Sequence, residues 1–427
     1  MIAVALVLML VLMAIAIPVA VSLGILGIAL EQIFSPLPLI RAIGEVSWSA
    51  SNEFLLVSVP MFILLGEILL RSGFAERMYG ALVNWVSWLP GGLMHSNIAA
   101  CAMFAATSGS SVATAATVGT VALPQARRFG YNERIFLGTL AAGGTLGILI
   151  PPSINMIIYA VLTNSSVPNL YLAGIVPGLV LVLIFMLTII ALCLYRPAWG
   201  GRRIRSNWGE RLKGLVHLVP PLGIFILVVG SIYVGVATPT EAASLGVLGA
   251  LALAWGAGRL SFAMLRDAFE GTMKSTAMVM LIVLAAYFLN FVISAIGLTT
   301  QLTNFIEGLG LPKSATLFAV ILFYVVLGCF METLSMMITT IPIIAPIMFK
   351  LGYDPVWFGI LIILLIETAL VTPPVGLNLF VVQNLRPGGS MNDVIIGTAP
   401  FVVALFVMIF LLTVFPDLAL WLPRLIS

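Results

Sequence analysis

Two pairs of polar, helix-breaking segments carry the residue types best suited to chemistry in this chain. One pair is the Gly/Ser-rich segment 108–111 and the segment around Glu332; the other contains the Pro-Pro dipeptides at 151–152 and 373–374. Where a helix is broken, backbone carbonyls lose their partners within the helix. Such oxygens, with nearby Ser and Thr hydroxyls, suit Na⁺, whereas the N-termini of half-helices favour an anion. The pattern therefore predicts two cation sites and an anionic-substrate site.

Four polar side chains near these breaks have more than one interpretation. Glu332 and Glu367 are predicted to lie in the breaks of the second unit. Ionisable residues at membrane depth are costly to bury and usually functional. Either one could bind Na⁺, carry a proton, or cap a helix end by accepting backbone N–H groups. Asn155 and Asn378 follow the two Pro-Pro pairs. They could contact substrate or an ion, or could only satisfy the neighbouring backbone.

The helix-breaking positions recur after a shift of 222 residues. The matches are Ser22-Leu23-Gly24 with Ser244-Leu245-Gly246, Pro90 with Pro312, Pro124 with Pro346, Gly130-Tyr131 with Gly352-Tyr353, Phe136 with Phe358, and Pro151-Pro152 with Pro373-Pro374. A constant offset over this distance indicates two copies of one unit. In membrane proteins, Gly/Pro-interrupted segments at matching positions of two halves point to the binding site of a secondary transporter.

Composition places the chain in a membrane and argues against other functions. Hydrophobic residues make up 61% and charged residues 8% of the sequence, far from the composition of soluble domains. Three scattered cysteines and two histidines give no metal cluster or disulfide framework. The sequence contains no nucleotide-binding loop of the G-x-x-x-x-G-K type. We expect neither an enzyme nor a cofactor, and no transition metal.

The apolar runs predict an all-α integral membrane protein with two inverted structural repeats. The first repeat, 1–200, has helices at 2–17 and 18–33, a polar stretch 34–52, helices at 54–70 and 72–89, a re-entrant helical hairpin at 92–128, a helix at 134–163 broken at Gly143-Gly144 and at 147–152, and a helix at 170–194. A cytoplasmic linker covers 201–217. The second repeat, 218–427, has scaffold helices within 220–297, including a surface segment before a span at 276–297, then a hairpin at 314–349, a broken helix at 356–385 and a helix at 394–421. We expect 1–33 to be retained helix rather than a cleaved signal peptide.

Charge bias predicts the orientation of these segments. If the linker lies in the cytoplasm, 15 of the 19 Lys and Arg residues fall inside, as the positive-inside rule requires. Each unit then crosses the membrane five times, counting a hairpin as no net crossing. Because five is odd, the second unit is inverted relative to the first.

Four segments carry a resemblance to a known transporter family. They read GSSVATAATVG, AAGGTLGILIPPS, GCFMETLSMM and IETALVTPPVGLNLFVV. They are similar to the signature segments of the large membrane subunit of tripartite ATP-independent periplasmic (TRAP) transporters, and the resemblance covers essentially the whole chain. It implies Na⁺-driven uptake of an organic acid across the bacterial inner membrane, with an elevator-type fold. It also implies two partners, a small four-helix membrane subunit and a periplasmic substrate-binding protein; the small subunit is expected to be a separate chain.

The chemistry of the breaks and the resemblance together give the candidate sites. The Na⁺-binding candidates are Ser108, Gly109, Ser110, Ser111, Gly144, Thr145, Gly328, Glu332, Thr333, Glu367, Thr372 and Gly376. The substrate-binding candidates are Ser110, Ser153, Asn155, Thr333, Pro374 and Asn378.

The sequence leaves the substrate and one rival function open. Dicarboxylates, sugar acids, sialic acid and sulfonates are all compatible with it, because selectivity in such systems comes largely from the periplasmic protein. The rival is a stand-alone Na⁺/dicarboxylate carrier of related fold that needs no binding protein. Reconstitution of this chain alone distinguishes the two.

Overall fold

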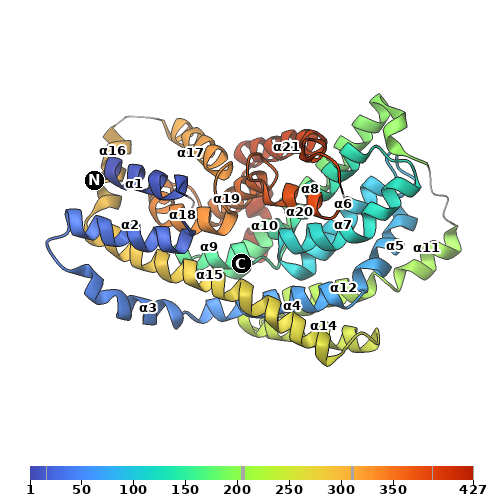
Figure 1. Cartoon of the computed structure of the whole chain (residues 1–427), viewed down its shortest axis with the longest axis horizontal. Coiled ribbons are helices and arrows are strands. Elements are labelled where there is room, and N and C mark those ends of the chain that lie inside the picture. The colour runs from blue at the N-terminus through green and yellow to red at the C-terminus, as the bar shows by residue number, and fades with distance from the viewer. Residues whose placement is uncertain (16, 203–206, 309–311, 387, 427) are drawn as a thin grey trace.

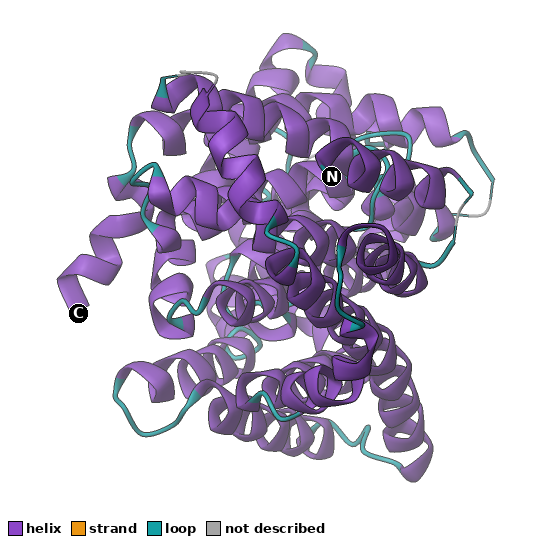
Figure 2. Ribbon diagram, turned by 90° about the vertical axis from the view of Figure 1, so that its left-hand side faces the viewer, coloured by secondary structure: helices purple, strands orange, loops and turns teal. Residues whose placement is uncertain are grey.

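The computed structural model describes residues 1–15, 17–202, 207–308, 312–386 and 388–426. Every regular element in these ranges is a helix (Figure 2). The helices of the N-terminal half are α1 (Ile2–Ala14), α2 (Val19–Phe34), η1 (Leu39–Ala42), α3 (Ile43–Ser51), η2 (Phe54–Val57), α4 (Ser58–Arg71), α5 (Phe74–Val86), α6 (Leu93–Ser108), α7 (Ser111–Arg128), α8 (Glu133–Leu149), α9 (Ile154–Thr163), α10 (Val167–Tyr195) and η3 (Pro197–Gly200).

The C-terminal half follows a similar order. Its helices are α11 (Trp208–Leu215), α12 (Val219–Phe225), the π-helical η4 (Ile226–Gly230), α13 (Ser231–Tyr233), α14 (Pro239–Gly256), α15 (Phe262–Ala295), α16 (Leu298–Gly308), α17 (Lys313–Gly328), α18 (Thr333–Lys350), α19 (Pro355–Leu370), α20 (Leu377–Asn384), α21 (Met391–Val414) and α22 (Asp417–Ile426).

The helix bounds repeat with the offset found in the sequence. Shifting α7 by 222 gives 333–350, the bounds of α18, and shifting α8 gives 355–371, within one residue of α19. The pairs α2 and α14, α5 and α16, and α9 and α20 also correspond within two residues at each end. Both Pro-Pro peptide bonds, 151–152 and 373–374, are cis. The offset therefore relates helices as well as residue types.

Polar N-caps explain where many of these helices begin. A side-chain oxygen that accepts a hydrogen bond from the first helical turn satisfies a backbone N–H that otherwise lacks a partner. The capping residues are Ser110 for α7, Asn132 for α8, Ser153 for α9, Ser166 for α10, Thr238 for α14, Ser261 for α15, Glu332 for α18, Asp354 for α19 and Ser390 for α21. Several of the caps lie at the polar breaks noted in the sequence.

The described residues contain six helical segments long and apolar enough to cross a membrane. They are 54–71, 167–195, 208–233, 262–295, 333–350 and 391–414; α8 and α9, bent by 42° at their break, form a seventh if counted as one span. The chain is thus built as a multi-pass membrane protein.

Some expected boundaries were wrong. Helix α8 is continuous through Gly143-Gly144 and ends at Leu149, because these glycines serve close packing: a Cβ at Gly143 would lie 2.9 Å from the Cys101 sulfur. The stretch 34–52 contains η1 and α3, and the surface segment before 276 joins the next span in the single 34-residue helix α15. The segment 394–421 divides into α21 and α22, since Pro416 lies between them and disfavours helix in the residue before it.

The helices form two adjoining groups. In Figure 1, α2, α3, α4, α14 and α15 run along the lower side, with α15 packed against α2 and α4, and α4 against α14. Above them, α8 packs against α6, α7 and α21, and α19 packs against α17, α18 and α21. The Pro-Pro breaks therefore belong to the upper group.

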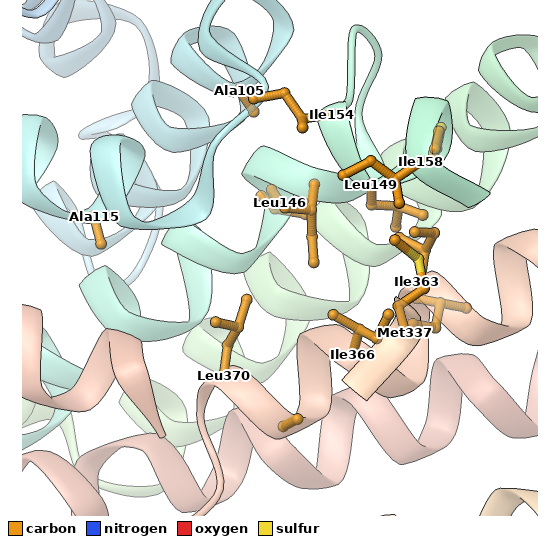
Figure 3. Packing of buried hydrophobic residues seen from close by; sticks show 14 of the residues in the cluster. Ala105, Ala115, Leu146, Leu149, Ile154, Ile158, Met337, Ile363, Ile366 and Leu370 are labelled. Atoms are coloured by element: carbon orange, nitrogen blue, oxygen red, sulfur yellow. The ribbon is translucent and has the colours of Figure 1, made fainter. Parts of the chain in front are cut away.

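The core of the upper group joins the two halves of the chain. Leu146 and Leu149 of α8 and Ile366 and Leu370 of α19 are at most 1% exposed and lie near one another (Figure 3). Helices α8 and α19 correspond under the 222-residue shift and pack directly on each other. Burial of these apolar side chains keeps the two breaks in one packed unit.

Helices α8 and α21 cross at very short backbone distance. A Cβ at Gly138 would lie 2.0 Å from the Gly397 carbonyl oxygen, and a Cβ at Gly397 would lie 1.8 Å from the Arg134 carbonyl oxygen. Small residues permit this backbone approach between membrane helices. Asp393 fixes the same crossing, since its carboxylate accepts from Arg134 Nε at 2.8 Å and from Arg386 Nη2 at 3.3 Å.

We predict that Gly397→Ala destabilises the protein by about 1–3 kcal/mol, the usual range for overpacking a tight contact. The added methyl has no space without separating α8 from α21. Thermal unfolding of the purified chain in detergent measures the effect. Gly24→Ala is the matched control, because no atom lies within 4 Å of the Cβ position at this α2 glycine. Equal unfolding temperatures for the two variants would contradict the tight crossing.

Candidate functional site

The loop joining α6 to α7 packs against the break between α8 and α9. Gly109, with φ of +63°, ends α6, and a Cβ on it would lie 2.8 Å from the Pro152 carbonyl oxygen. A Cβ at Gly147 of α8 would lie 2.5 Å from the Ser110 carbonyl oxygen. The two glycines thus permit backbone-to-backbone contact between the loop, here called tip 1 (108–111), and the first break (150–153).

Hydroxyl and carbonyl oxygens concentrate at tip 1. Ser108 Oγ lies 3.1 Å from Thr114 Oγ1, which donates to the Ser110 carbonyl oxygen at 2.7 Å. On the break side, Ser153 Oγ donates to the Ile148 carbonyl oxygen at 2.6 Å. Oxygen atoms of this kind are the ligands that Na⁺ prefers. Tip 1 and the first break thus place several hydroxyl and carbonyl oxygens on two segments that are in contact.

The second loop and break repeat this contact with different residues. The loop 329–332, here called tip 2, joins α17 to α18, and its Cys329 carbonyl oxygen accepts from Val375 N in the second break (371–376) at 3.2 Å. A Cβ at Gly328 would lie 2.5 Å from the Ala369 Cβ. Thr372 Oγ1 donates to the Thr368 carbonyl oxygen at 2.6 Å, and Gly376, with φ of +44°, begins α20.

Glu332 has the geometry of a helix cap. Its carboxylate accepts from the backbone N–H groups of Leu334 at 3.1 Å and Ser335 at 2.9 Å. It also accepts from the hydroxyls of Thr333 and Ser335, at 2.8 Å and 2.9 Å. Of the three roles considered for Glu332, the hydrogen bonds favour capping of α18, because a carboxylate at a helix N-terminus is stabilised by the orphan N–H groups.

Glu367 lies in a different environment from the one expected. It sits in the regular part of α19 rather than in the break, which begins at Val371. The side chain is fully buried, and neither carboxylate oxygen has a hydrogen-bond partner among the described residues. Unpaired buried carboxylates are rare and need an explanation. Of the three roles considered for Glu367, helix capping is therefore not supported by the described contacts.

The two halves of the chain meet at Asn378. Its Nδ2 donates to the Ala141 carbonyl oxygen of α8 at 3.1 Å, and it lies 3.0 Å from the Cβ position of Gly144. The same Cβ position lies 2.7 Å from the Ala115 Cβ of α7. Asn378 Oδ1 and Asn155 Nδ2 are buried without a partner in the described chain. Both amides therefore satisfy only part of their hydrogen-bonding capacity.

The packing of the breaks is reciprocal. Helix α7 of the first hairpin packs on α20 after the second break, and α18 of the second hairpin packs on α9 after the first break. Because α7 corresponds to α18 and α9 to α20, one contact is the counterpart of the other under the shift. The candidate residues accordingly divide among tip 1, tip 2 and the junction at Asn378.

The candidate residues predicted from the sequence lie in three different places in the fold. Ser108 to Ser111 and Ser153 gather at the first break; Gly328, Glu332, Thr333, Thr372, Pro374 and Gly376 gather at the second; and Gly144, Thr145 and Asn378 lie in or against α8. Thr145 Oγ1 donates to the Ala142 carbonyl oxygen at 2.8 Å, so the hydrogen-bond donor of this hydroxyl is used within its own helix.

Sequence reasoning missed two residues at tip 1. The Thr114 hydroxyl lies within hydrogen-bond distance of both the Ser108 hydroxyl and the Ser110 carbonyl oxygen. Gly66 of α4, in the lower helix group, also lies close to tip 1, because its Cβ position is 3.3 Å from the Ser108 carbonyl oxygen. The available signal for Gly66 was a glycine inside an apolar helix, which often marks close helix contact.

Comparison with known proteins finds one matching family model and several similar transporter proteins. The family model described as "Tripartite ATP-independent periplasmic transporter, DctM component" matches residues 6–418. The C4-dicarboxylate TRAP transporter large permease protein DctM of Pseudomonas aeruginosa is 34% identical over 406 residues, covering 94% of each chain. The ectoine/5-hydroxyectoine TRAP transporter large permease protein UehC of Ruegeria pomeroyi is 33% identical, covering 86% of this chain and 85% of that protein. The isethionate TRAP transporter permease protein DctMQ of Oleidesulfovibrio alaskensis is 32% identical; the match covers 86% of this chain and 57% of the longer protein.

The fold also resembles a solved transporter. The crystal structure of the Alcanivorax borkumensis YdaH transporter superposes with a TM-score of 0.62, covering 94% of this chain and 97% of that one at 16% sequence identity. At this identity the likeness concerns the fold alone. The family match along nearly the whole length is decisive: the chain belongs to the DctM family, the large permease subunits of tripartite ATP-independent periplasmic transporters.

Proposed function

We propose that this chain carries out Na⁺-coupled secondary active uptake of a small organic acid anion across the bacterial inner membrane. The observation that carries the proposal is the paired contact of a polar tip with a Pro-Pro break, made twice at an offset of 222 residues. Interrupted helices at matching positions of two halves supply exposed carbonyls for a cation and helix N-termini for an anion. The chain has both.

The cations are proposed to bind at the two tip–break contacts. At the first, the oxygens come from Ser108, Ser110 and Ser153 and from the backbone around Gly109. At the second, they come from Thr372 and the backbone of the break, with Thr333 and Gly376 nearby. We assign Glu332 to capping of α18, and propose that the Glu367 carboxylate supplies the negative charge that attracts the cation to the second site. A buried carboxylate without a partner is best accounted for if a cation approaches it.

The substrate is proposed to bind where the two halves meet. Asn155 and Asn378 lie in the first turns of α9 and α20, and each has a buried amide atom without a partner. The N-terminal ends of these helices carry positive dipole ends that favour a carboxylate or sulfonate. The relatives are named for C4-dicarboxylates, ectoines and isethionate, and a small organic acid of this kind is the proposed cargo.

An elevator motion is the proposed mechanism. The hairpins and broken helices, 92–163 and 314–385, would move as a transport domain, while helices within 1–89 and 220–297 form the scaffold. The repeats are proposed to be inverted, which supplies two near-equivalent end states, one for each side of the membrane. The reciprocal packing of α7 on α20 and α18 on α9 supports such a two-fold relation.

Two partners follow from the family. We propose that a small TRAP membrane subunit docks on lipid-facing scaffold helices and that a periplasmic binding protein delivers the substrate. The alternative is a stand-alone Na⁺/dicarboxylate carrier. Uptake by the chain reconstituted alone would favour that alternative, and uptake only with both partners would favour the tripartite form.

Uptake into proteoliposomes containing the chain and its two partners should require an inward Na⁺ gradient. The reason is that, without bound Na⁺, no cation balances the partial negative charge of the carbonyl and hydroxyl oxygens at the tips and breaks. The measurement is accumulation of radiolabelled substrate with Na⁺ outside, against K⁺ outside at equal ionic strength. Equal accumulation in both conditions, or with a proton gradient replacing Na⁺, contradicts the proposal.

Ser110→Leu and Thr372→Leu should each reduce initial uptake by more than roughly tenfold, a loss of about 1.4 kcal/mol or more, with normal expression. Each change replaces a hydroxyl at a tip or break by an apolar side chain. Val112→Leu, at an exposed position of α7 beside tip 1, is the control for added bulk, and Thr372→Ser should restore most of the uptake. Wild-type uptake by either leucine variant would place the sites elsewhere.

A further inference from the structure

A short amphipathic helix lies along the face that the charge bias assigns to the cytoplasm. Helix α11 packs on α5: Trp85 Nε1 donates to the Arg211 carbonyl oxygen at 3.1 Å, and the Cβ position of Gly214 lies 3.4 Å from the Ala81 Cβ. Residue numbers rise along α11 as they fall along α5, so the two segments are antiparallel. This register brings His217, just past α11, beside Arg77 near the start of α5.

Arg77 and His217 line the same cavity, which confirms that register. The cavity has a volume of about 170 Å³ and lies between the start of α5, the α11–α12 connection and the end of α14. Its polar wall consists of Ser72, Arg77 and His217, and its apolar wall includes Phe74, Pro220 and Leu253. A basic, half-apolar cavity between membrane helices has the composition of a headgroup site.

Exposed cations and a tryptophan continue this surface along α11. Lys213 is exposed, Arg211 is half-buried, and the Arg211 guanidinium lies 5.0 Å from the centre of the Trp208 ring. The Trp208 side chain is 66% exposed. Glu210, the acidic residue of this helix, is held at its N-terminus, where it accepts from Asn207 N at 3.2 Å. On α5, Glu76 is the exposed acid next to Arg77.

We propose that this surface, α11 together with the Arg77–His217 cavity, binds an anionic phospholipid of the inner leaflet. The lipid phosphate would lie against Arg77 and His217, Arg211 and Lys213 would attract neighbouring headgroups, and Trp208 would sit at the headgroup level. Tryptophan prefers the membrane interface, and basic residues beside a membrane span attract anionic lipids. The assignment to the inner leaflet rests on the orientation predicted from the charge bias and on the proposed function; the binding chemistry does not.

The test is lipid binding by the purified full chain in a neutral detergent. Phosphatidylglycerol or phosphatidylcholine is titrated in mixed micelles, and the rise in unfolding temperature gives an apparent affinity. The triple variant Arg77→Gln/Arg211→Gln/Lys213→Gln removes three charges from the surface. The control triple Arg41→Gln/Lys350→Gln/Arg424→Gln removes three charges from the face predicted to lie outside.

Phosphatidylglycerol should stabilise the wild type and the control triple equally, and high salt should weaken the effect. The surface triple should lose affinity about fivefold per charge, or roughly a hundredfold in all. If that variant is not recovered folded, Lys213→Glu compared with Arg41→Glu makes the same comparison at exposed positions. Equal responses of the surface and control variants, an equal effect of phosphatidylcholine, or an equal effect of inorganic phosphate alone would overturn the proposal. Because the readout is binding, loss of sodium dependence in the transport assay would leave this result unaffected.

Discussion

Backbone polar groups that are shielded from water need partners, and the two helix breaks are possible because other parts of the protein cover them. A lipid-exposed break would leave N–H and C=O groups unsatisfied at a cost of several kcal/mol each. Here the covering is done by the tips: Gly109 lies against the Pro152 carbonyl and Gly147 against the Ser110 carbonyl, while the Cys329 carbonyl takes the N–H of Val375. The same contacts that make the breaks tolerable bring carbonyls and hydroxyls together. The contacts between tips and breaks therefore explain both why the breaks are stable and why cations are proposed to bind there.

This constraint also accounts for the way the two halves interlock. Each hairpin covers its own break with its tip and packs its second helix on the broken helix of the other half, α7 on α20 and α18 on α9. Asn378 donates to the α8 backbone at the centre of this arrangement, and the α8–α21 crossing at Gly138 and Gly397 joins α21 to it. Movement of one hairpin and its break without the other would disrupt the α7–α20, α18–α9 and Asn378–Ala141 contacts. The interlocking thus favours displacement of both as a unit.

The parts of the fold that depend on helix-breaking residues nearby in the sequence were predictable. Pro151-Pro152 and Pro373-Pro374 marked both breaks, and the 222-residue offset anticipated corresponding helices such as α7 and α18. Sequence-based prediction failed where a local signal is overridden by packing: Gly143-Gly144 reads as a break but is helix, because Gly143 admits the Cys101 sulfur. It also left the roles of Glu332 and Glu367 open, since a carboxylate's role depends on which donors surround it.

Features that depend on neighbours far away in the chain could not be predicted. Nothing local indicates that Gly138 meets Gly397, that Gly66 approaches Ser108, or that Asn378 donates to Ala141. Each contact joins helices whose adjacency only the folded chain defines. The fold class and the segments of the site were thus accessible from the sequence, whereas the pairing of atoms within the site was not.

The most direct test of the two-domain account is a pair of distance measurements by electron spin resonance. One label pair, at Arg128 of α7 and Trp255 of α14, spans the proposed transport domain and scaffold; the other, at Arg128 and Phe318 of α17, lies within the transport domain. All three labelled positions are exposed, and the native cysteines are first replaced by alanine. Addition of Na⁺, substrate and the binding protein should change the distance distribution of the first pair and leave the second unchanged. A fixed first distance under conditions that support uptake, or a change in the second pair alone, would contradict the account.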